Sequence, residues 1–174
     1  MCALRGAQGR PVSRWRRRVL GALALLLLAG VAALWWRAVP RASAAPHALR
    51  PDDAALVAQG QRIYAQHCAR CHGVRGEGQP NWRERGDDGL LPAPPHDASG
   101  HTWHHPDDQL FALTRQGVAQ VINQPDYRSA MPAYAGTLSD EQIVAVLSWI
   151  KAQWPDEVRR RHDDINAQAA AARR

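Results

Sequence analysis

The sequence predicts an all-α fold that is preceded by one hydrophobic helix near the N-terminus. Apolar residues recur at spacings of three and four on both sides of a central region rich in proline, which is the period of an amphipathic helix. No stretch shows the sustained alternation of apolar and polar residues that is typical of a strand. With 174 residues, the chain is long enough for one domain of ordinary size with additional segments.

The hydrophobic segment is an uncharged run of 18 residues over 19–36, which is about the shortest length that crosses a bilayer. Four arginines directly precede it, so the positive-inside rule places residues 1–18 in the cytoplasm. A cleaved signal peptide is the alternative, because residues 42–44 read Ala-Ser-Ala. We favour a retained membrane anchor, since Arg37 and Arg41 separate the run from that site. The segment 37–50, rich in alanine, proline and arginine, is predicted to be a linker.

The excess positive charge belongs to the N-terminal region. The formal net charge is +6, and residues 1–44 hold eight arginines and no acidic residue. The rest of the chain has 14 basic and 16 acidic residues. The globular part therefore lacks the basic excess that is typical of nucleic-acid binding, and we expect no nucleic-acid partner.

The stretch YAQHCARCHG, residues 64–73, places Cys68 and Cys71 two residues apart and directly before His72. A disulfide between them would close a very small loop and stabilise little. A zinc site needs four ligands, and the chain has no second pair of this kind. The third interpretation is covalent attachment of one haem c, for which C-x-x-C-H is the motif. Each thiol would add to one vinyl group of the porphyrin, and His72 would bind the iron.

Export of this motif agrees with the predicted topology. Covalent haem attachment in bacteria takes place outside the cytoplasmic membrane, and everything after residue 44 is expected on that side. We therefore expect a single-pass protein of the bacterial inner membrane whose haem domain, residues 51–155, lies on the periplasmic side.

Three helices are predicted around this motif. Asp52 and Asp53 suit the start of the first, which runs into the motif. The segments 73–89 and 90–105 are predicted loops, and Pro106 is expected as the first residue of the second helix, which ends at Gly117. Residues 118–136 are expected to be irregular. The first two helices are predicted from residues that recur at spacings of three and four, which are Leu56, Gly60, Ile63, Tyr64, His67, Leu110 and Leu113.

The last helix of the domain has the clearest start. Ser139 and Gln142 form a capping box. One apolar stripe follows, and Pro155 ends the helix. Residues 156–174 are charged and weakly amphipathic, so we expect an exposed or frayed helix there. The stripe consists of Ile143, Val146, Leu147 and Ile150.

Met131 is the candidate for the sixth ligand of the iron. It lies in a loop before the last helix and is followed by Pro132. A thioether suits haem iron, and His/Met ligation raises the reduction potential. Packing in the core is the alternative role for a lone methionine.

With these residues in place, the sequence resembles the class I monohaem cytochrome c family, in the form of a membrane-anchored bacterial member. The resemblance covers about residues 52–154. It implies a cytochrome c fold around one covalent haem, in which the first and last helices cross near Gly60. It also implies that a backbone carbonyl, from Pro92 or Pro94, orients the proximal histidine. The motifs that carry it are Gly60 and Tyr64 ahead of Cys68–Gly73, the pair Met131-Pro132, and a closing helix with Leu147, Trp149 and Ile150.

The resemblance implies a one-electron carrier in a bacterial respiratory or related redox chain, and not an enzyme. Two permanent axial ligands leave no position for a small-molecule substrate. Redox proteins are the expected partners, docking at the haem edge, with the membrane contacted through the N-terminal helix. Trp82, Trp103 and Tyr127 are candidate donors to the haem propionates.

The segment 96–105 departs from the simple family pattern because it holds four histidines near two aspartates. This density is compatible with copper or another transition metal, and a polar loop is the alternative. One of these histidines replacing Met131 is a further possibility. Two other functions therefore stay open: a ligand-binding or catalytic haem with an open sixth site, and a copper-handling redox protein. The residues are His96, Asp97, His101, His104, His105 and Asp107.

Overall fold

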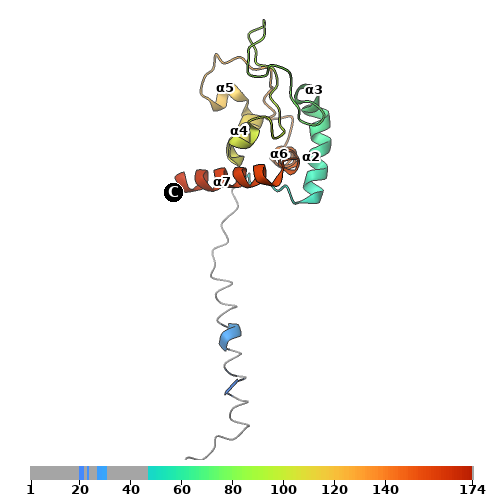
Figure 1. The fold of residues 1–174 in the computed structure, drawn as a ribbon. Helices are drawn as coiled ribbons and strands as arrows, with labels where there is room; N and C mark the ends of the chain where they lie inside the picture. Colours follow the sequence, from blue (N-terminus) through green and yellow to red (C-terminus); the bar gives the residue numbers. More distant parts are fainter. Residues whose placement is uncertain (1–19, 22, 24–26, 31–46, 174) are drawn as a thin grey trace, which may run out of the picture. The chain divides into compact units, whose positions relative to one another are not determined.

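A computed structural model of the chain describes residues 20–21, 23, 27–30 and 47–173 (Figure 1). The chain divides into two units, Met1–Ser43 and Ala44–Arg174. In the first unit the described residues are helical, but most of the predicted anchor over 19–36 and of the linker over 37–50 lies outside the described residues. Among those that are described, none belongs to a helix with the length and apolarity to cross a membrane. The anchor therefore stays a prediction.

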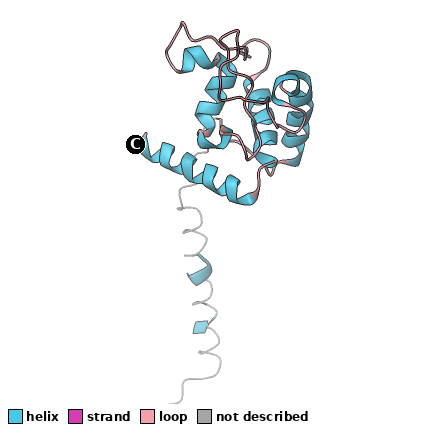
Figure 2. Ribbon diagram, turned by 45° about the horizontal axis from the view of Figure 1, so that its top comes forward, coloured by secondary structure: helices cyan, strands magenta, loops and turns pink. Residues whose placement is uncertain are grey.

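The second unit is built of helices and loops (Figure 2). No strand is present among residues 47–173, where the one extended feature is an isolated bridge between Ala135 and Leu138. The all-α prediction is thus confirmed for the described part of the chain. The elements in order are α2 (Ala54–His67), α3 (Ala69–His72), the 3₁₀ turn η1 (Thr102–His104), α4 (Asp107–Gln116), α5 (Val118–Val121), α6 (Asp140–Ala152) and α7 (Asp156–Ala172).

The core is organised by the crossing of α2 and α6, which lie against each other (Figure 1). A Cβ atom at Gly60 of α2 would lie 2.0 Å from the carbonyl oxygen of Ala145 and 2.8 Å from Cβ of Trp149. Only glycine allows the two backbones to come this close. The crossing near Gly60 that the family resemblance implied is therefore confirmed.

Both helices begin at side-chain caps that the sequence predicted. The carboxylate of Asp53 accepts a hydrogen bond of 3.1 Å from the backbone N–H of Leu56. At α6, Ser139 Oγ accepts from the N–H of Gln142 at 3.2 Å, and Gln142 Oε1 accepts from the N–H of Ser139 at 2.8 Å. These caps satisfy backbone donors that the first turn of a helix leaves free.

The helix α6 is buried on all sides and not along a single stripe. Every residue from Ile143 to Lys151 is buried, including Ser148 and Lys151. The prediction of one apolar face was too narrow, because α2, α4 and the segment before α2 all pack on this helix. Ser148 shows the last contact, since its hydroxyl accepts a hydrogen bond of 2.9 Å from the N–H of Arg50.

Three shorter features differ from the predictions. Pro106 has an extended backbone, with φ −66° and ψ 158°, and is the N-cap of α4 rather than its first residue. The turn η1 and the helix α5 occupy parts of the predicted loops 90–105 and 118–136. With three and four residues, they are too short to produce a periodic pattern. Gly117 ends α4 with a positive φ of 84°, as predicted.

The C-terminal helix α7 forms as expected and most of its surface is exposed, but it is not frayed, because one of its faces is docked on the domain. The side chain of His162 is fully buried, and its Nε2–H donates to the carbonyl of His105 at 3.0 Å. Asn166 Nδ2 donates to Asp107 Oδ1 at 3.0 Å, and Asn166 Oδ1 accepts from the N–H of Asp107 at 2.8 Å. Val158 also packs against the core, but the side chains that make the hydrogen bonds of this face are polar, so the sequence is only weakly amphipathic here.

We predict that Gly60→Ala destabilises the domain, because the added methyl group meets the backbone of Ala145. The free energy of unfolding should fall by about 2 to 3 kcal/mol, as is usual for an overpacked core. Chemical denaturation of the haem-loaded protein measures this. Gln61→Ala, on the exposed side of the same helix, is the control and should change stability by less than about 0.5 kcal/mol. Helix propensity alone predicts a gain for Gly60→Ala of about 1 kcal/mol, and a gain would contradict the close crossing.

We also predict that the docking of α7 weakens in acid. Burial lowers the pKa of His162, the nearby Lys151 lowers it further, and Asp107 opposes this. The neutral form is favoured in the fold, so its contribution is complete above the unfolded-state pKa of about 6.5 and is lost as the pH falls toward the lower folded-state pKa. Hydrogen-exchange protection of α7 should therefore decrease from about pH 7.5 to about pH 5.5. In His162→Gln this pH dependence should disappear, whereas His104→Gln should keep it; equal profiles in all three proteins would refute the prediction.

Candidate haem-binding site

The C-x-x-C-H motif forms one tight turn at the end of α2. Cys68 ends α2, and the backbone N–H groups of Cys71 and His72 both donate to the Cys68 carbonyl, at 3.1 and 3.0 Å. The two sulfurs therefore belong to a single helical turn that ends at His72. Both cysteines are free, Cys68 partly buried and Cys71 exposed, so the disulfide interpretation is not borne out.

The surroundings of the two thiols do not complete a zinc site among the described residues. Burial, assisted by the nearby Cys71, raises the pKa of Cys68 to about 11. No group of three or more histidine, cysteine or acidic side chains that could hold a metal ion occurs among the described residues.

His72 is held with one ring nitrogen available. The side chain is 7% exposed, and its Nδ1 lies 2.8 Å from the carbonyl oxygen of Pro94. Because a carbonyl only accepts, Nδ1 carries the proton and Nε2 keeps its lone pair for a metal. Burial lowers the pKa of His72, although the hydrogen bond to Pro94 opposes this. Of the two carbonyls that the resemblance suggested, Pro94 is the one that binds His72.

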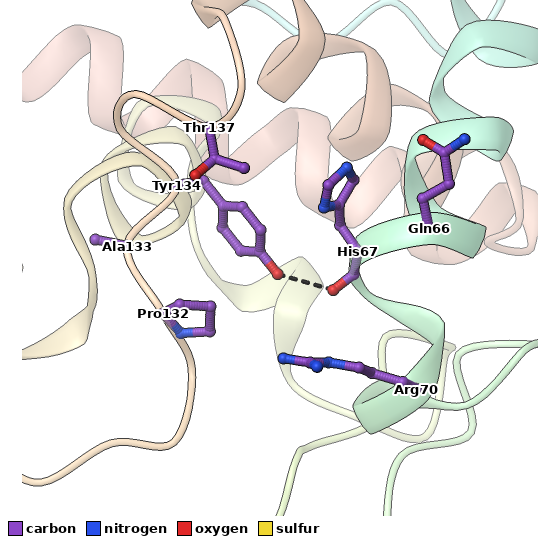
Figure 3. Close-up of a pocket in the computed structure, with 7 residues that line it drawn as sticks. All are labelled: Gln66, His67, Arg70, Pro132, Ala133, Tyr134 and Thr137. Atoms are coloured by element: carbon purple, nitrogen blue, oxygen red, sulfur yellow. Dashed lines mark hydrogen bonds between the residues drawn. The ribbon is translucent and has the colours of Figure 1, made fainter.

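The loop that carries Met131 is tied to the motif through Tyr134. Met131 is partly buried against the core, and its N–H donates to Ser129 Oγ at 3.1 Å. The Tyr134 hydroxyl donates to the carbonyl of His67 at 2.8 Å, one residue before the motif begins. Figure 3 shows this contact, with the Tyr134 side chain reaching toward the end of α2. The structure thus joins the loop of the candidate sixth ligand to the turn of the candidate fifth.

A shallow hollow of about 230 Å³ lies beside this contact. Arg70, from within the motif, and Pro132, which follows Met131, both line it (Figure 3). The hollow therefore opens where the motif and the Met131 loop meet at the surface. Its other lining residues are Gln66, His67, Ala133, Tyr134 and Thr137.

The histidines of the 96–105 segment do not converge on one point. His101 stacks on Trp82 at 5.2 Å between ring centroids, and His104 lies on Trp103 at 3.7 Å. His105 is 5.4 Å from the ring of His101 in an edge-to-face arrangement, and no third potential ligand joins a metal-binding group among the described residues. The copper-handling alternative thus finds no site in the described part of the chain.

The fourth histidine, His96, has a different neighbour, which the sequence analysis missed. Its ring stacks on the ring of His72, with centroids 3.9 Å apart and an angle of 20° between the planes. Burial lowers the pKa of His96 well below the usual value, and the proximity of His72 and His101 lowers it further. No sequence pattern indicates this contact, because the two residues are 24 positions apart and His96 lies in a loop.

The aromatic candidates for the propionates have other partners in the structure. Trp103 Nε1 donates to the carbonyl of Ala98 at 3.3 Å, which occupies its donor. Tyr127 lies under the guanidinium of Arg85, at 5.5 Å from the ring centroid. Arg85 and Tyr127 also line a second surface depression of about 530 Å³.

The donor set fits a covalent haem. Two free thiols lie on one turn, an imidazole beside them offers Nε2, and the adjoining loop carries a thioether. Together, the crossed helices, the C-x-x-C-H turn and the carbonyl-bound histidine define a c-type cytochrome with one haem.

Comparison with protein families also identifies a c-type cytochrome and specifies its family. Residues 55–150 match the model of the family described as Cytochrome C oxidase, cbb3-type, subunit III. The match covers more than half of the chain, and the protein belongs to this family. It therefore binds haem c covalently and carries electrons between redox proteins. A search of solved structures finds no match.

Proposed function

We propose that the domain is a one-electron carrier whose haem is attached at Cys68 and Cys71 and ligated by His72 and Met131. The observation that carries this proposal is the hydrogen bond of 2.8 Å from His72 Nδ1 to Pro94, which leaves Nε2 as the metal-binding nitrogen. The haem supplies the one-electron couple of its iron. Because both axial ligands come from the chain, no position is left for a substrate, and the protein is not an enzyme.

The protein's own part in this function is to hold the two ligands. Tyr134 spans from the Met131 loop to the carbonyl of His67, so the loop cannot move away from the motif without breaking this bond. The loop is also fixed from behind, because the N–H groups of Tyr134 and Ala135 donate to the carbonyls of Thr114 and Arg115, at 3.0 and 2.8 Å. A ligand held this way needs little rearrangement when the charge of the iron changes.

We propose that redox partners dock over the hollow between Arg70 and Pro132. Arg70 is exposed and lies next to Cys71, which is also exposed. The positive charge of Arg70 favours an acidic partner surface, which would accelerate encounter more than it tightens binding.

We propose that this carrier is attached to a membrane. We propose that residues 1–18 are cytoplasmic, that 19–36 anchor the chain in the bacterial inner membrane, and that the haem domain lies on the periplasmic side. The family description supports a respiratory oxidase of the cbb3 type as the complex that the domain serves. An anchor would confine the carrier to encounters along the membrane.

Replacement of Met131 tests the axial ligation. The ferric wild-type protein should show the weak long-wavelength charge-transfer band that a methionine sulfur on ferric haem produces, and Met131→Ala should lose it. Ser129→Ala removes the hydrogen bond to the Met131 backbone but keeps the thioether, so it should keep the band. Carbon monoxide should bind the ferrous wild type poorly and Met131→Ala readily. A wild type that lacks the band and binds carbon monoxide has an open sixth site, and one that lacks the band without binding it has a second histidine.

Charge reversal at Arg70 tests the docking surface. Oxidation of the ferrous protein by the anion ferricyanide should slow by about three- to fivefold in Arg70→Glu, because the local potential becomes less attractive. The difference should shrink at an ionic strength of about 1 M, where screening is nearly complete. Arg160→Glu makes the same change of net charge on the exposed side of α7 and is the control. Equal slowing in both variants would show that only the net charge matters and would exclude Arg70 from the docking surface.

A further inference from the structure

The proximal side of the site holds a contact that the axial ligation does not require. The ring of His96 lies flat on the ring of His72, at 3.9 Å between centroids. The hydrogen bond to Pro94 restrains the orientation of His72 through one ring atom, Nδ1, and makes no contact with the faces of the ring. A flat neighbour on the ring face adds a second restraint on rotation about the Cβ–Cγ bond, because turning the imidazole drives its edge into the neighbouring ring.

His96 can act in this way only if its own ring is fixed, and Thr102 fixes it. The hydroxyl oxygen of Thr102 lies 2.9 Å from His96 Nδ1 and 3.3 Å from the carbonyl oxygen of Pro95. The hydroxyl satisfies both contacts when its proton goes to Pro95, since a carbonyl only accepts. His96 Nδ1–H is then the donor to Thr102, which sets the orientation of the ring. Thr102 is itself buried, so this bond is shielded from water.

The backbone of His96 is held from two further directions. Its N–H donates to the carbonyl of Gly76, in the loop that follows the motif, at 2.7 Å. Its carbonyl accepts from Trp154 Nε1 at 2.7 Å. At Gly100 a Cβ atom would lie 2.0 Å from the carbonyl oxygen of Pro95, so the segment before His96 is closely packed from behind. The stacked ring therefore belongs to a segment that has little room to move.

Trp154 connects this arrangement to the C-terminal helix. The indole is 3% exposed and lies just beyond the 55–150 range that matches the family. Its ring meets the buried ring of His162 edge to face, at 5.0 Å between centroids. A continuous path of contacts thus runs from α7 through Trp154 and His96 to His72.

We propose that His96 is a positioning residue for His72: stacked on its ring and held by Thr102 and Trp154, it fixes the plane of the proximal imidazole. This inference rests on the proposed ligation of the haem by His72. It assigns a task to a histidine that belongs neither to the ligand pair nor to the attachment motif. It also connects the segment from Trp154 onward to the proximal ligand of the iron, through the contacts of Trp154 with His96 and of His96 with His72.

The test uses a property that depends on the plane of the axial imidazole. In the ferric low-spin protein, the hyperfine shifts of the four haem methyl groups in proton NMR, and the electron paramagnetic resonance g values, report this plane. His96→Ala should change the order or the spread of the methyl shifts. His96→Phe keeps a flat ring on His72 and should restore the wild-type order. His104→Ala removes an exposed histidine of the same segment and should leave the pattern unchanged.

Trp154→Phe extends the test to the C-terminal link. It keeps an aromatic ring beside His162 but loses the N–H that binds the His96 carbonyl. It should change the methyl shifts in the same direction as His96→Ala and by a smaller amount. An unchanged pattern in Trp154→Phe would remove the C-terminal segment from the proposal.

The positioning role of His96 is overturned by either of two results: His96→Ala keeps the wild-type methyl order, or His96→Phe differs from wild type as much as His96→Ala does. If His96→Ala does not retain haem, His96→Phe alone tests the positioning role. A wild-type pattern of methyl shifts in His96→Phe supports the role, and a changed pattern contradicts it. A failure of the proposed function would be seen in a different measurement. If His72 does not ligate the haem, the wild-type protein itself lacks the low-spin signals of an axial histidine, before any substitution at His96 is made.

Discussion

The close approach of α2 and α6 at Gly60 is the constraint on which the rest of the domain depends. The motif turn follows α2 directly, and the Met131 loop precedes α6, so this one crossing sets the distance between the two candidate ligands of the iron. The contact is made by backbone and Cβ atoms, which cannot adjust by changing rotamer. Because the crossing is defined by backbone contact, it fixes the positions at which the ligand loops leave the two helices. The loops themselves then need only a few hydrogen bonds to hold their conformation.

These hydrogen bonds are made by side chains that donate to backbone carbonyls. His72 binds Pro94, Tyr134 binds His67, and Tyr64 of α2 donates to the carbonyl of Gly73 at 2.9 Å. Each bond joins the C-x-x-C-H turn, or a residue directly beside it, to another segment of the chain. Such bonds satisfy buried carbonyls and at the same time hold the ligands in place, which is why a small domain with long loops can keep a fixed site.

The sequence revealed the features whose causes are local. The C-x-x-C-H turn and the caps at Asp53 and Ser139 follow from spacing and residue type and were predicted from them, whereas the glycine at the helix crossing was implied by the family resemblance. The stacking of His96 on His72 was not predicted, because it depends on how a proline-rich loop returns to the motif. The density of histidines along 96–105 was compatible with a metal site, but in the folded domain the rings pair with different side chains, and no group of three or more potential ligands forms among the described residues.

The docking of α7 was missed for a different reason, and that reason bears on what the helix does. An apolar helix face adheres to a core in several registers, but a buried polar face is stable only where every donor meets its acceptor. His162 meets the carbonyl of His105, Asn166 meets both the N–H and the carboxylate of Asp107, and the buried Lys151 meets Asp163. A shift of α7 by one residue would leave these groups buried without partners, at a cost of about 1 to 3 kcal/mol each. The polar face therefore fixes α7 in one position, which in turn fixes the edge-to-face contact of His162 with Trp154.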